Sequence, residues 1–189
     1  MRAFLAFEIA SPVKDYLQGV IGLMASRIPG VKWIKRDGQH ITLKFFGNIE
    51  ERMAHDLREK LKEVEEKFRP FEATLKDIDA FPSRRKARVI VVTLEKGVDF
   101  AKAIFHDIER VLTTFGVERE QRAFIPHITL GRKREPSVLF EKELPVVEEM
   151  SFIIDRVVLF RSTLTPQGAI YSPVWEIVFK GGPQAMDNG

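Results

Sequence analysis

The sequence has no cysteine in its 189 residues. A chain without thiols has no disulfide framework, no thiolate metal site and no cysteine nucleophile, so its chemistry must come from oxygen groups and imidazoles. A long apolar run is also missing. The stretch MRAFLAFEIASP meets the charged KDY before a signal-peptide core is complete, and no segment approaches the length of a membrane span. We expect a cytoplasmic protein with no membrane segment.

The chain carries no large excess of charge of either sign. Thirty Lys and Arg face twenty-seven Asp and Glu, so the formal net charge is only +3, and the pI near 9.2 mildly favours a polyanionic partner. Hydrophobic residues make up 44% of the chain, including fifteen phenylalanines, which is enough to fill a substantial core. We expect one monomeric domain of two closely joined lobes over residues 1–189, with residues 181–189 as a disordered tail.

Histidine is scarce, with only four copies. Two of them open the same tetrapeptide, His-Ile-Thr-Leu, at His40 and again at His127. The other two, His55 and His106, lie on the polar faces of predicted helices, where solvated histidines are common. A single His-x-Thr on a strand is more often a hydrogen-bonded, partly buried histidine than a catalyst, but the repetition favours a function for this pair.

The apolar periodicity predicts an α+β fold. Steps of three and four residues predict helices near residues 12–26, 50–68 and 99–116, and apolar or alternating runs predict the strands between them. Each half of the chain offers strands, a helix and one HITL strand, an order that suggests two related lobes. Strict alternation within the first motif places His40, Thr42 and Lys44 on one face and Phe45 on the opposite, core face.

Each His-x-Thr places an imidazole beside a hydroxyl, because residues two apart on a strand project from the same face about 6.5–7 Å apart. Two such pairs facing each other would hold a tetrahedral anion, with hydroxyls donating to its oxygens and imidazoles on opposite sides of the phosphorus. In-line displacement at phosphorus needs a base on one side and an acid on the other. Histidine suits both roles, since its unperturbed pKa is about 6.5.

The same two histidines are also compatible with two alternative functions. Two imidazoles from facing strands could hold zinc with a carboxylate as third ligand, although neither motif has an Asp or Glu in its immediate run. A non-catalytic module that binds RNA ends would keep the groove without turnover. Such a module would bind a cyclic-phosphate end tightly and form no product, whereas a zinc enzyme would lose its activity on chelation and contain stoichiometric metal.

Cationic and aromatic residues near the motifs are candidates for binding nucleic acid, because arginine forks onto phosphate oxygens and aromatic rings stack on bases. Strict alternation puts Arg132 on the face opposite His127, so a role for it requires a bend near Gly131. The candidates are Lys44, Phe46, Arg132, Arg161 and Tyr171, followed by Trp33 and the turn residues Arg84, Arg85 and Lys86.

The chain resembles the two-histidine phosphoesterase superfamily, whose signature is a pair of His-x-Thr or His-x-Ser motifs. Within it the sequence is similar to the RNA 2',3'-cyclic phosphodiesterases, historically called 2'-5' RNA ligases. The matching pieces span nearly the whole chain. They are RAFLAFEI, Trp33 with the following HITLKFFG, PHITLGR, and LFRSTLTPQGAIYSPVWEI.

The resemblance implies two antiparallel sheets facing each other across a central groove, with helices outside and one motif in each lobe. It also implies hydrolysis of a terminal 2',3'-cyclic phosphate of RNA to a 2'-phosphate without a metal or cofactor, and weak reversible 2'-5' ligation in some members. Carried over by residue, His40, Thr42, His127 and Thr129 are catalytic and Arg132 contacts phosphate or nucleotide. We assign His127 as the proton acceptor and His40 as the proton donor.

Overall fold

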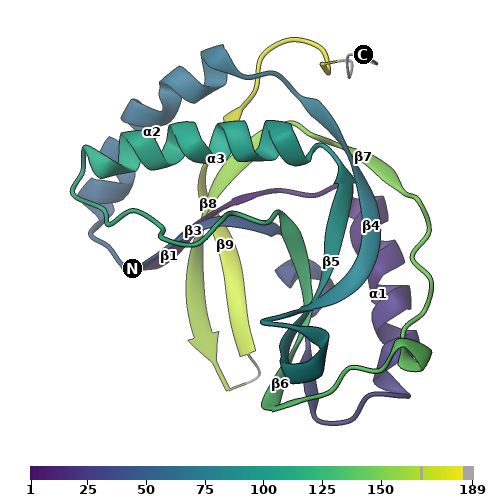
Figure 1. Cartoon of the computed structure of the whole chain (residues 1–189). Helices are drawn as coiled ribbons and strands as arrows, with labels where there is room; N and C mark the ends of the chain where they lie inside the picture. Colours follow the sequence, from purple (N-terminus) through teal and green to yellow (C-terminus); the bar gives the residue numbers. More distant parts are fainter. Residues whose placement is uncertain (167, 185–189) are drawn as a thin grey trace.

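The computed structural model describes residues 1–166 and 168–184 and consists of two antiparallel sheets with three α-helices (Figure 1). The α+β prediction with two antiparallel sheets is confirmed. In spatial order the four-stranded sheet, sheet A, contains β3 (Ile41–Asn48), β1 (Arg2–Phe7), β8 (Arg156–Thr165) and β9 (Gly168–Val178). The five-stranded sheet, sheet B, contains β2 (Val31–Trp33), β6 (His127–Ser137), β5 (Ala87–Lys96), β4 (Phe71–Phe81) and β7 (Ser151–Ile154).

The two sheets do not correspond to the two halves of the sequence. Sheet A combines two strands from the start of the chain with two from its end, and the middle of the chain forms most of sheet B. Each of the two lobes suggested by the order of elements therefore contributes strands to both sheets. Each sheet nevertheless carries one HITL motif, His40 immediately before β3 and β6 beginning at His127.

The helices are α1 (Ser11–Ala25), α2 (Glu51–Lys67) and α3 (Val98–Thr113). The carbonyl of Ala54 in α2 accepts a 2.8 Å hydrogen bond from Trp175 Nε1 of β9, and α2 lies beside α3 over sheet A (Figure 1). Helix α1 instead lies against sheet B, where Gln18 Nε2 donates to the carbonyl of Ile34 just after β2 at 3.0 Å. Three short 3-10 helices complete the fold, η1 (Arg36–Gly38), η2 (Arg84–Lys86) and η3 (Glu141–Glu143).

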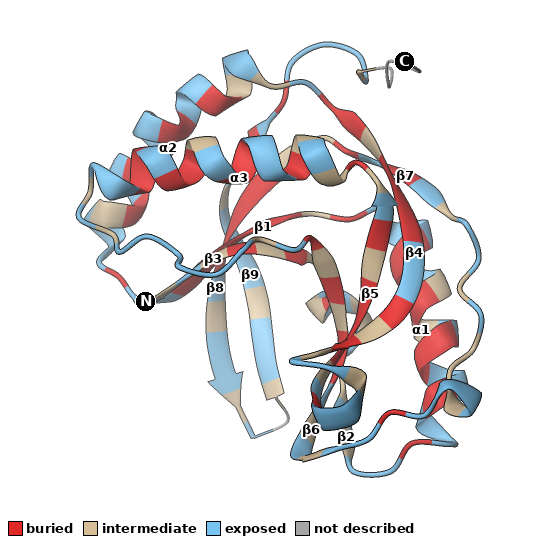
Figure 2. Cartoon of the chain, in the orientation of Figure 1, coloured by how far each residue is buried: buried red, intermediate tan, exposed pale blue. Residues whose placement is uncertain are grey.

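Strand β1 is apolar and buried on both faces from residue 3 to residue 7, whereas much of β8 and β9 is exposed (Figure 2). Leu5 and Phe7 join the main core, which α1, α2 and α3 line with their buried faces. Phe4 points the other way and forms a second, small cluster. That cluster consists of Phe4, Ala6, Val158 and Phe160, with Tyr171 packed against it.

The carboxy-terminal segment is described up to residue 184, and residues 185–189 of the predicted disordered tail lie outside the described residues. The amide of Gln184 donates to the carbonyl of Pro70 at 2.7 Å, and Gln184 forms an isolated parallel bridge with Phe71. The described part of the tail therefore lies at the start of β4.

Candidate active site

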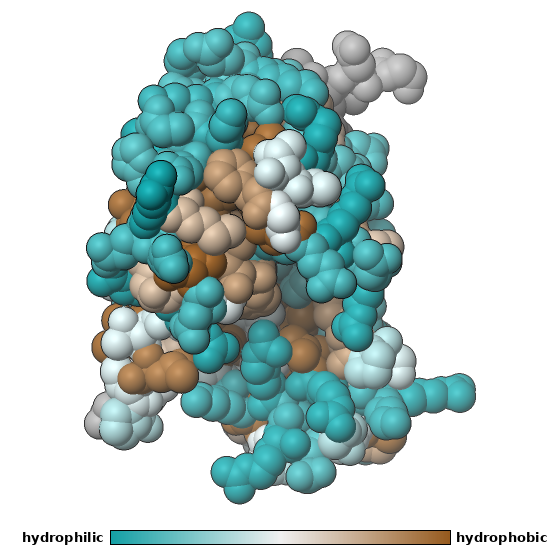
Figure 3. Space-filling model, turned by 90° about the vertical axis from the view of Figure 1, so that its left-hand side faces the viewer, coloured by the Kyte–Doolittle hydropathy of each residue, from teal (hydrophilic) through white to brown (hydrophobic). Residues whose placement is uncertain are grey.

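A groove of about 1330 Å³ runs between the two sheets, and both HITL motifs contribute to it. Thr42 lines it from sheet A, and His127, Thr129 and Arg132 line it from sheet B. Figure 3 shows a face of the molecule on which apolar side chains gather around a hollow and hydrophilic ones border it. The hydroxyls that the sequence proposes as phosphate ligands thus share one cavity with an imidazole and a guanidinium.

A β-bulge follows the threonine of the first motif. Thr42 pairs with Ala6 and Lys44 with Leu5, so Leu43 is an extra residue in β3 with no partner in β1. A bulge reverses the side-chain alternation beyond it. Lys44 consequently points to the helix side of sheet A, and Phe45 enters the groove.

The second motif has the same bulge at the same place. Thr129 pairs with Val91 and Gly131 with Ile90, so Leu130 is the extra residue in β6. Arg132 then lies opposite Val89 and lines the groove with His127. The bend that a role for Arg132 requires is therefore present.

Gly131 permits a close approach of β2 at this bend. A Cβ atom on Gly131 would lie 2.5 Å from Val31 Cγ1 and 2.8 Å from Trp33 Cε3, closer than carbon atoms approach. The indole of Trp33 packs against the main core and covers this glycine. Trp33, a stacking candidate from the sequence, thus supports the back of β6.

His40 lies half-buried among aromatic rings on the groove side of sheet A. Its ring centroid is 4.6 Å from that of Phe4 and 5.4 Å from that of Tyr171, which meets it edge-on. Burial is the main cause that lowers the pKa of His40 to about 3, and the charges of Lys14 and Arg132 lower it further. A backbone hydrogen bond with Gly38 acts in the opposite direction. The imidazole is therefore neutral in the free protein at pH 7.

A backbone hydrogen bond and an edge-on aromatic ring hold the imidazole of His127. Its Nδ1–H donates to the carbonyl of Ile125 at 2.6 Å, and the ring of Phe81 meets it edge-on at 4.9 Å. Burial lowers the pKa of His127, the hydrogen bond with Ile125 raises it, and the charge of Arg132 lowers it. Because Nδ1 carries the proton, Nε2 retains its lone pair and can accept one.

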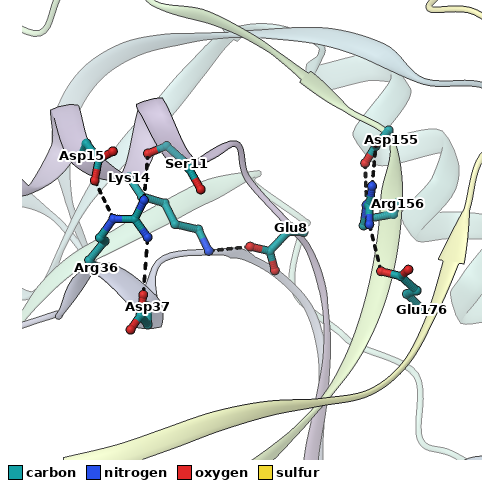
Figure 4. A network of polar contacts seen from close by, with 9 residues as sticks. All are labelled: Glu8, Ser11, Lys14, Asp15, Arg36, Asp37, Asp155, Arg156 and Glu176. Atoms are coloured by element: carbon teal, nitrogen blue, oxygen red, sulfur yellow. Dashed lines mark hydrogen bonds and ion pairs between the residues drawn. The ribbon is translucent and has the colours of Figure 1, made fainter.

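A buried cation lies near His40. The ammonium of Lys14, on α1, forms an ion pair with Glu8, and the side chain of Lys14 is only 11% exposed (Figure 4). The pair follows from the fold, because Glu8 comes directly after β1, and β1 pairs with β3, the strand that His40 immediately precedes. Sequence inspection did not single out Lys14, since a lysine in the first turns of a helix usually faces solvent.

Lys44 lines the groove but does not share a face with His40 and Thr42, so the strict alternation assumed from the sequence is wrong beyond Leu43. The bulge directs the ammonium of Lys44 to Glu109 Oε1 of α3 at 2.9 Å and to the carbonyl of Glu118 at 2.7 Å. Phe45, expected in the core, is 63% exposed. No sequence signal distinguishes the two, because the bulge depends on the partner strand.

The remaining candidates divide between the groove and other surfaces. Phe46 lines the groove but packs against the main core, and Tyr171 reaches the groove side through its contact with His40. Arg161 lies apart. Its side chain pairs with Glu51 at 3.3 Å, on the helix side of sheet A, because its neighbour Phe160 takes the groove side. The turn residue Arg84 pairs with Glu141 and Asp79, away from the motifs.

Among the described residues, no group of three or more His, Cys, Asp or Glu side chains is placed to hold a metal ion. Within the same residues, no helix is both long enough and apolar enough to cross a membrane.

The chain matches the family described as LigT like Phosphoesterase over residues 9–91 and 95–171. The protein belongs to this family. It is 31% identical to an RNA 2',3'-cyclic phosphodiesterase of Methanothermobacter thermautotrophicus over 91% of this chain and 95% of the relative. It is 29% identical to an RNA 2',3'-cyclic phosphodiesterase of Thermotoga maritima over 96% of this chain and 97% of the relative.

Solved structures share the fold of this family member. A crystal structure of a Thermus thermophilus protein superposes with a TM-score of 0.83 at 23% identity, covering 96% of this chain and 99% of that one. Escherichia coli LigT, complexed with 3'-AMP, superposes with a TM-score of 0.79 at 20% identity, covering 95% of this chain and 98% of that one. The two facing sheets are thus the architecture of the family.

Proposed function

We propose that the protein is an RNA 2',3'-cyclic phosphodiesterase that hydrolyses a terminal 2',3'-cyclic phosphate to a 2'-phosphate. The observation that supports this most directly is the arrival of both His-x-Thr motifs, one from each sheet, at a single groove that also contains Arg132. The curated relatives of the same length carry this activity in their names. An anion enclosed by two hydroxyls, a guanidinium and two imidazoles is the arrangement that displacement at phosphorus needs.

In the proposed reaction His127 Nε2 takes a proton from water as its oxygen attacks phosphorus. The contact of Nδ1 with Ile125 supports this role because it fixes the tautomer that leaves Nε2 free to accept. The bond from phosphorus to the 3' oxygen breaks, and His40 gives that oxygen a proton. Thr42 and Thr129 donate to the non-bridging oxygens, and Arg132 balances the charge that develops there.

The low pKa of His40 shapes the donor role. A proton donor must be protonated when the substrate is bound, whereas His40 alone has a pKa of about 3. A bound phosphodiester brings a negative charge next to the ring, and an adjacent opposite charge favours the protonated form. Substrate binding therefore favours the protonated donor, and transfer of the proton to the 3' oxygen returns the ring to its neutral state.

The test uses purified protein, EDTA and a short RNA that ends in a 2',3'-cyclic phosphate, with 2'- and 3'-phosphate products resolved. A positioned acid or base contributes about 10²–10⁴-fold, so His40→Ala and His127→Ala should each reduce kcat by at least about 100-fold. His55→Ala is the matched control, since that histidine is exposed on α2. A variant of either motif with near-normal turnover would remove that histidine from the mechanism.

The same assay separates the other two readings of the site. Intact substrate with tight binding of the cyclic-phosphate end would indicate a binding module, and turnover that EDTA abolishes and zinc restores would indicate a metal hydrolase. Weak, reversible 2'-5' ligation would use the same displacement, with the 5' hydroxyl of a second RNA attacking phosphorus in place of water. We also propose that the chain acts as one monomeric bilobal domain in the cytoplasm, which light scattering and cell fractionation test.

A further inference from the structure

Three cations lie on one face of sheet B, at the edge that β2 forms. Lys32 of β2 pairs with Arg132 of β6, and paired residues of neighbouring strands project from the same face. Arg134 lies two residues beyond Arg132 on β6, and its amide continues the ladder by donating to the carbonyl of Gly30 at 3.4 Å. Arg134 therefore shares the face of Arg132. We call Lys32, Arg132 and Arg134 the basic strip.

The basic strip begins in the groove and leads out of it. Arg132 lines the groove, whereas Lys32 and Arg134 are exposed beyond its lining. Strands β2 and β6 run side by side (Figure 2), and β2 leads through η1 to His40, so the strip lies where the chain crosses from sheet B to sheet A. Paired residues are about 5 Å apart and residues two apart on one strand about 7 Å, spans comparable to that between successive phosphates of one RNA strand.

The charge of the basic strip is not neutralised by carboxylates. Within residues 1–166 and 168–184, no Asp or Glu forms an ion pair with any of its three side chains. More deeply buried cations near the groove do have partners, since Lys14 pairs with Glu8 and Lys44 with Glu109. Neighbouring like charges repel each other, and a polyanion bound along the strip relieves that repulsion.

The backbone beneath the strip is held in place. On the opposite face of β2, Val31 and Trp33 pack against the main core. The amide of Ile34 donates to the carbonyl of Leu130 at 2.8 Å, and Gln18 of α1 donates to the carbonyl of Ile34 at 3.0 Å. Strand β2 is thus fixed to β6 and to α1, so the positions that carry the cations are preorganised.

A second segment with cations also lines the groove, residues 117–125 between α3 and β6. It contains two arginines, Arg119 and Arg122, and two glutamates, Glu118 and Glu120, so its net charge is zero. The basic strip has three cations and no carboxylate. Charge complementarity therefore favours the strip as the path of a polyanion.

We propose that Lys32 and Arg134 bind the phosphodiester on the 5' side of the nucleotide that carries the cyclic phosphate, so that the RNA chain leaves the groove along β2 and β6. This subsite deepens the proposed function and rests on it. A nucleoside 2',3'-cyclic phosphate lacks this phosphodiester, because its 5' oxygen is a free hydroxyl. The strip therefore favours RNA ends over mononucleotides, and it selects no sequence because it contacts only phosphates.

The test compares adenosine 2',3'-cyclic phosphate with the dinucleotide ApA that ends in the same cyclic phosphate. The double variant Lys32→Ala with Arg134→Ala should raise KM for the dinucleotide by roughly 3–25-fold, because an exposed ion pair corresponds to at most about fivefold. The same variant should leave kcat, and KM for the mononucleotide, nearly unchanged. Lys32→Arg with Arg134→Lys keeps both charges and should retain the KM for the dinucleotide.

The matched control is Lys102→Ala with Arg52→Ala, which removes the same charge from exposed positions on α3 and α2. Equal losses on both substrates, no loss on the dinucleotide, or an equal loss in the control would overturn the subsite. A loss on the dinucleotide that appears with Arg119→Ala and Arg122→Ala, and not with the strip variant, would place the chain along residues 117–125 and would also overturn it.

Salt dependence of binding tests the strip by itself. If the unmodified protein hydrolyses neither compound, the proposed function fails, and Kd is measured for adenosine 2'-phosphate and for ApA with a terminal 2'-phosphate. Each neutralised phosphate of a single strand contributes about 0.7 to the slope of log Kd against log salt, so the dinucleotide should have the steeper slope by about this amount. Lys32→Ala with Arg134→Ala should remove the difference. Equal slopes for both ligands in the unmodified protein refute the subsite.

Discussion

The ion pair between Lys44 and Glu109 gives the sharpest prediction about stability. The side chain of Lys44 is 10% exposed and that of Glu109 is 2% exposed, and the two charged atoms lie 2.9 Å apart. Lys44→Met keeps the length and apolar stem of the side chain but removes the charge. It leaves the Glu109 carboxylate buried, with the amide of Glu120 as its remaining donor in the described structure.

Removing one partner of a buried pair typically costs about 3–5 kcal/mol, because an uncompensated charge stays out of water. For a chain of this size that corresponds to a fall in Tm of roughly 6–20 °C. Urea unfolding at pH 7 measures the free energy directly. Arg110→Met is the matched control, because Arg110 lies on α3 next to Glu109. Its partner is Glu63 at 3.1 Å, both side chains are more than half exposed, and such a pair is worth at most about 1 kcal/mol.

The double variant Lys44→Met with Glu109→Leu tests the cause of the loss. Replacing both charges with apolar groups removes the stranded carboxylate, so the double variant should recover at least half of what Lys44→Met loses. Hydrogen exchange at the Glu120 amide should accelerate in the double variant, which removes the Glu109 carboxylate that accepts its hydrogen bond. If Lys44→Met costs no more than Arg110→Met, the buried pair does not stabilise the fold and this reasoning is wrong.

Three further predictions follow from other parts of the groove and its surroundings. Because burial lowers the pKa of His40 to about 3, NMR should show a neutral ring at about pH 5. The free energy of unfolding should fall as the pH drops below about 6.5, because only the unfolded state gains the proton. His40→Asn should reduce this fall. Gly131→Ala should lower Tm by several degrees, because its Cβ would meet Trp33, whereas Gly22→Ala, which meets nothing within 4 Å, should not. Arg161→Ala should leave kcat/KM within about twofold, since Arg161 pairs with Glu51 outside the groove.

Much of the fold follows from local patterns in the sequence. The steps of three and four residues predicted the three α-helices to within a few residues of their observed ends, because the apolar stripe of each helix is local information. Periodicity also predicted the α+β class, and the family resemblance predicted the two antiparallel sheets. The way strands are shared between the sheets was not predicted, since strand pairing is a long-range property that periodicity does not record.

In the candidate site, too, some residues were predicted from the local sequence, and others depend on how the strands pair. The repeated tetrapeptide singled out its histidines and threonines, because identity at two places is visible in the sequence alone. The side chains after each HITL required the bulges, which depend on how β3 meets β1 and how β6 meets β5. Alternation placed Lys44 on the face of His40 and Phe45 on the core face. In the structure both residues line the groove, the ammonium of Lys44 turns to Glu109 of α3, and Phe45 is exposed. The glycine after Leu130, by contrast, did signal the bend that brings Arg132 inward.

The two HITL motifs carry the same bulge at the same leucine, Leu43 in β3 and Leu130 in β6, which raises the question of how the groove fixes the direction of its substrate. Two identical motifs would accept a cyclic phosphate in either orientation, and each histidine would then act as acid in half of the encounters. The second residue after the extra leucine breaks this symmetry, since it is Phe45 on sheet A and Arg132 on sheet B. Under the proposed function, Arg132 draws the non-bridging oxygens towards sheet B and leaves the sugar on the side of His40. This asymmetry favours His40 as the proton donor to the 3' oxygen that leaves.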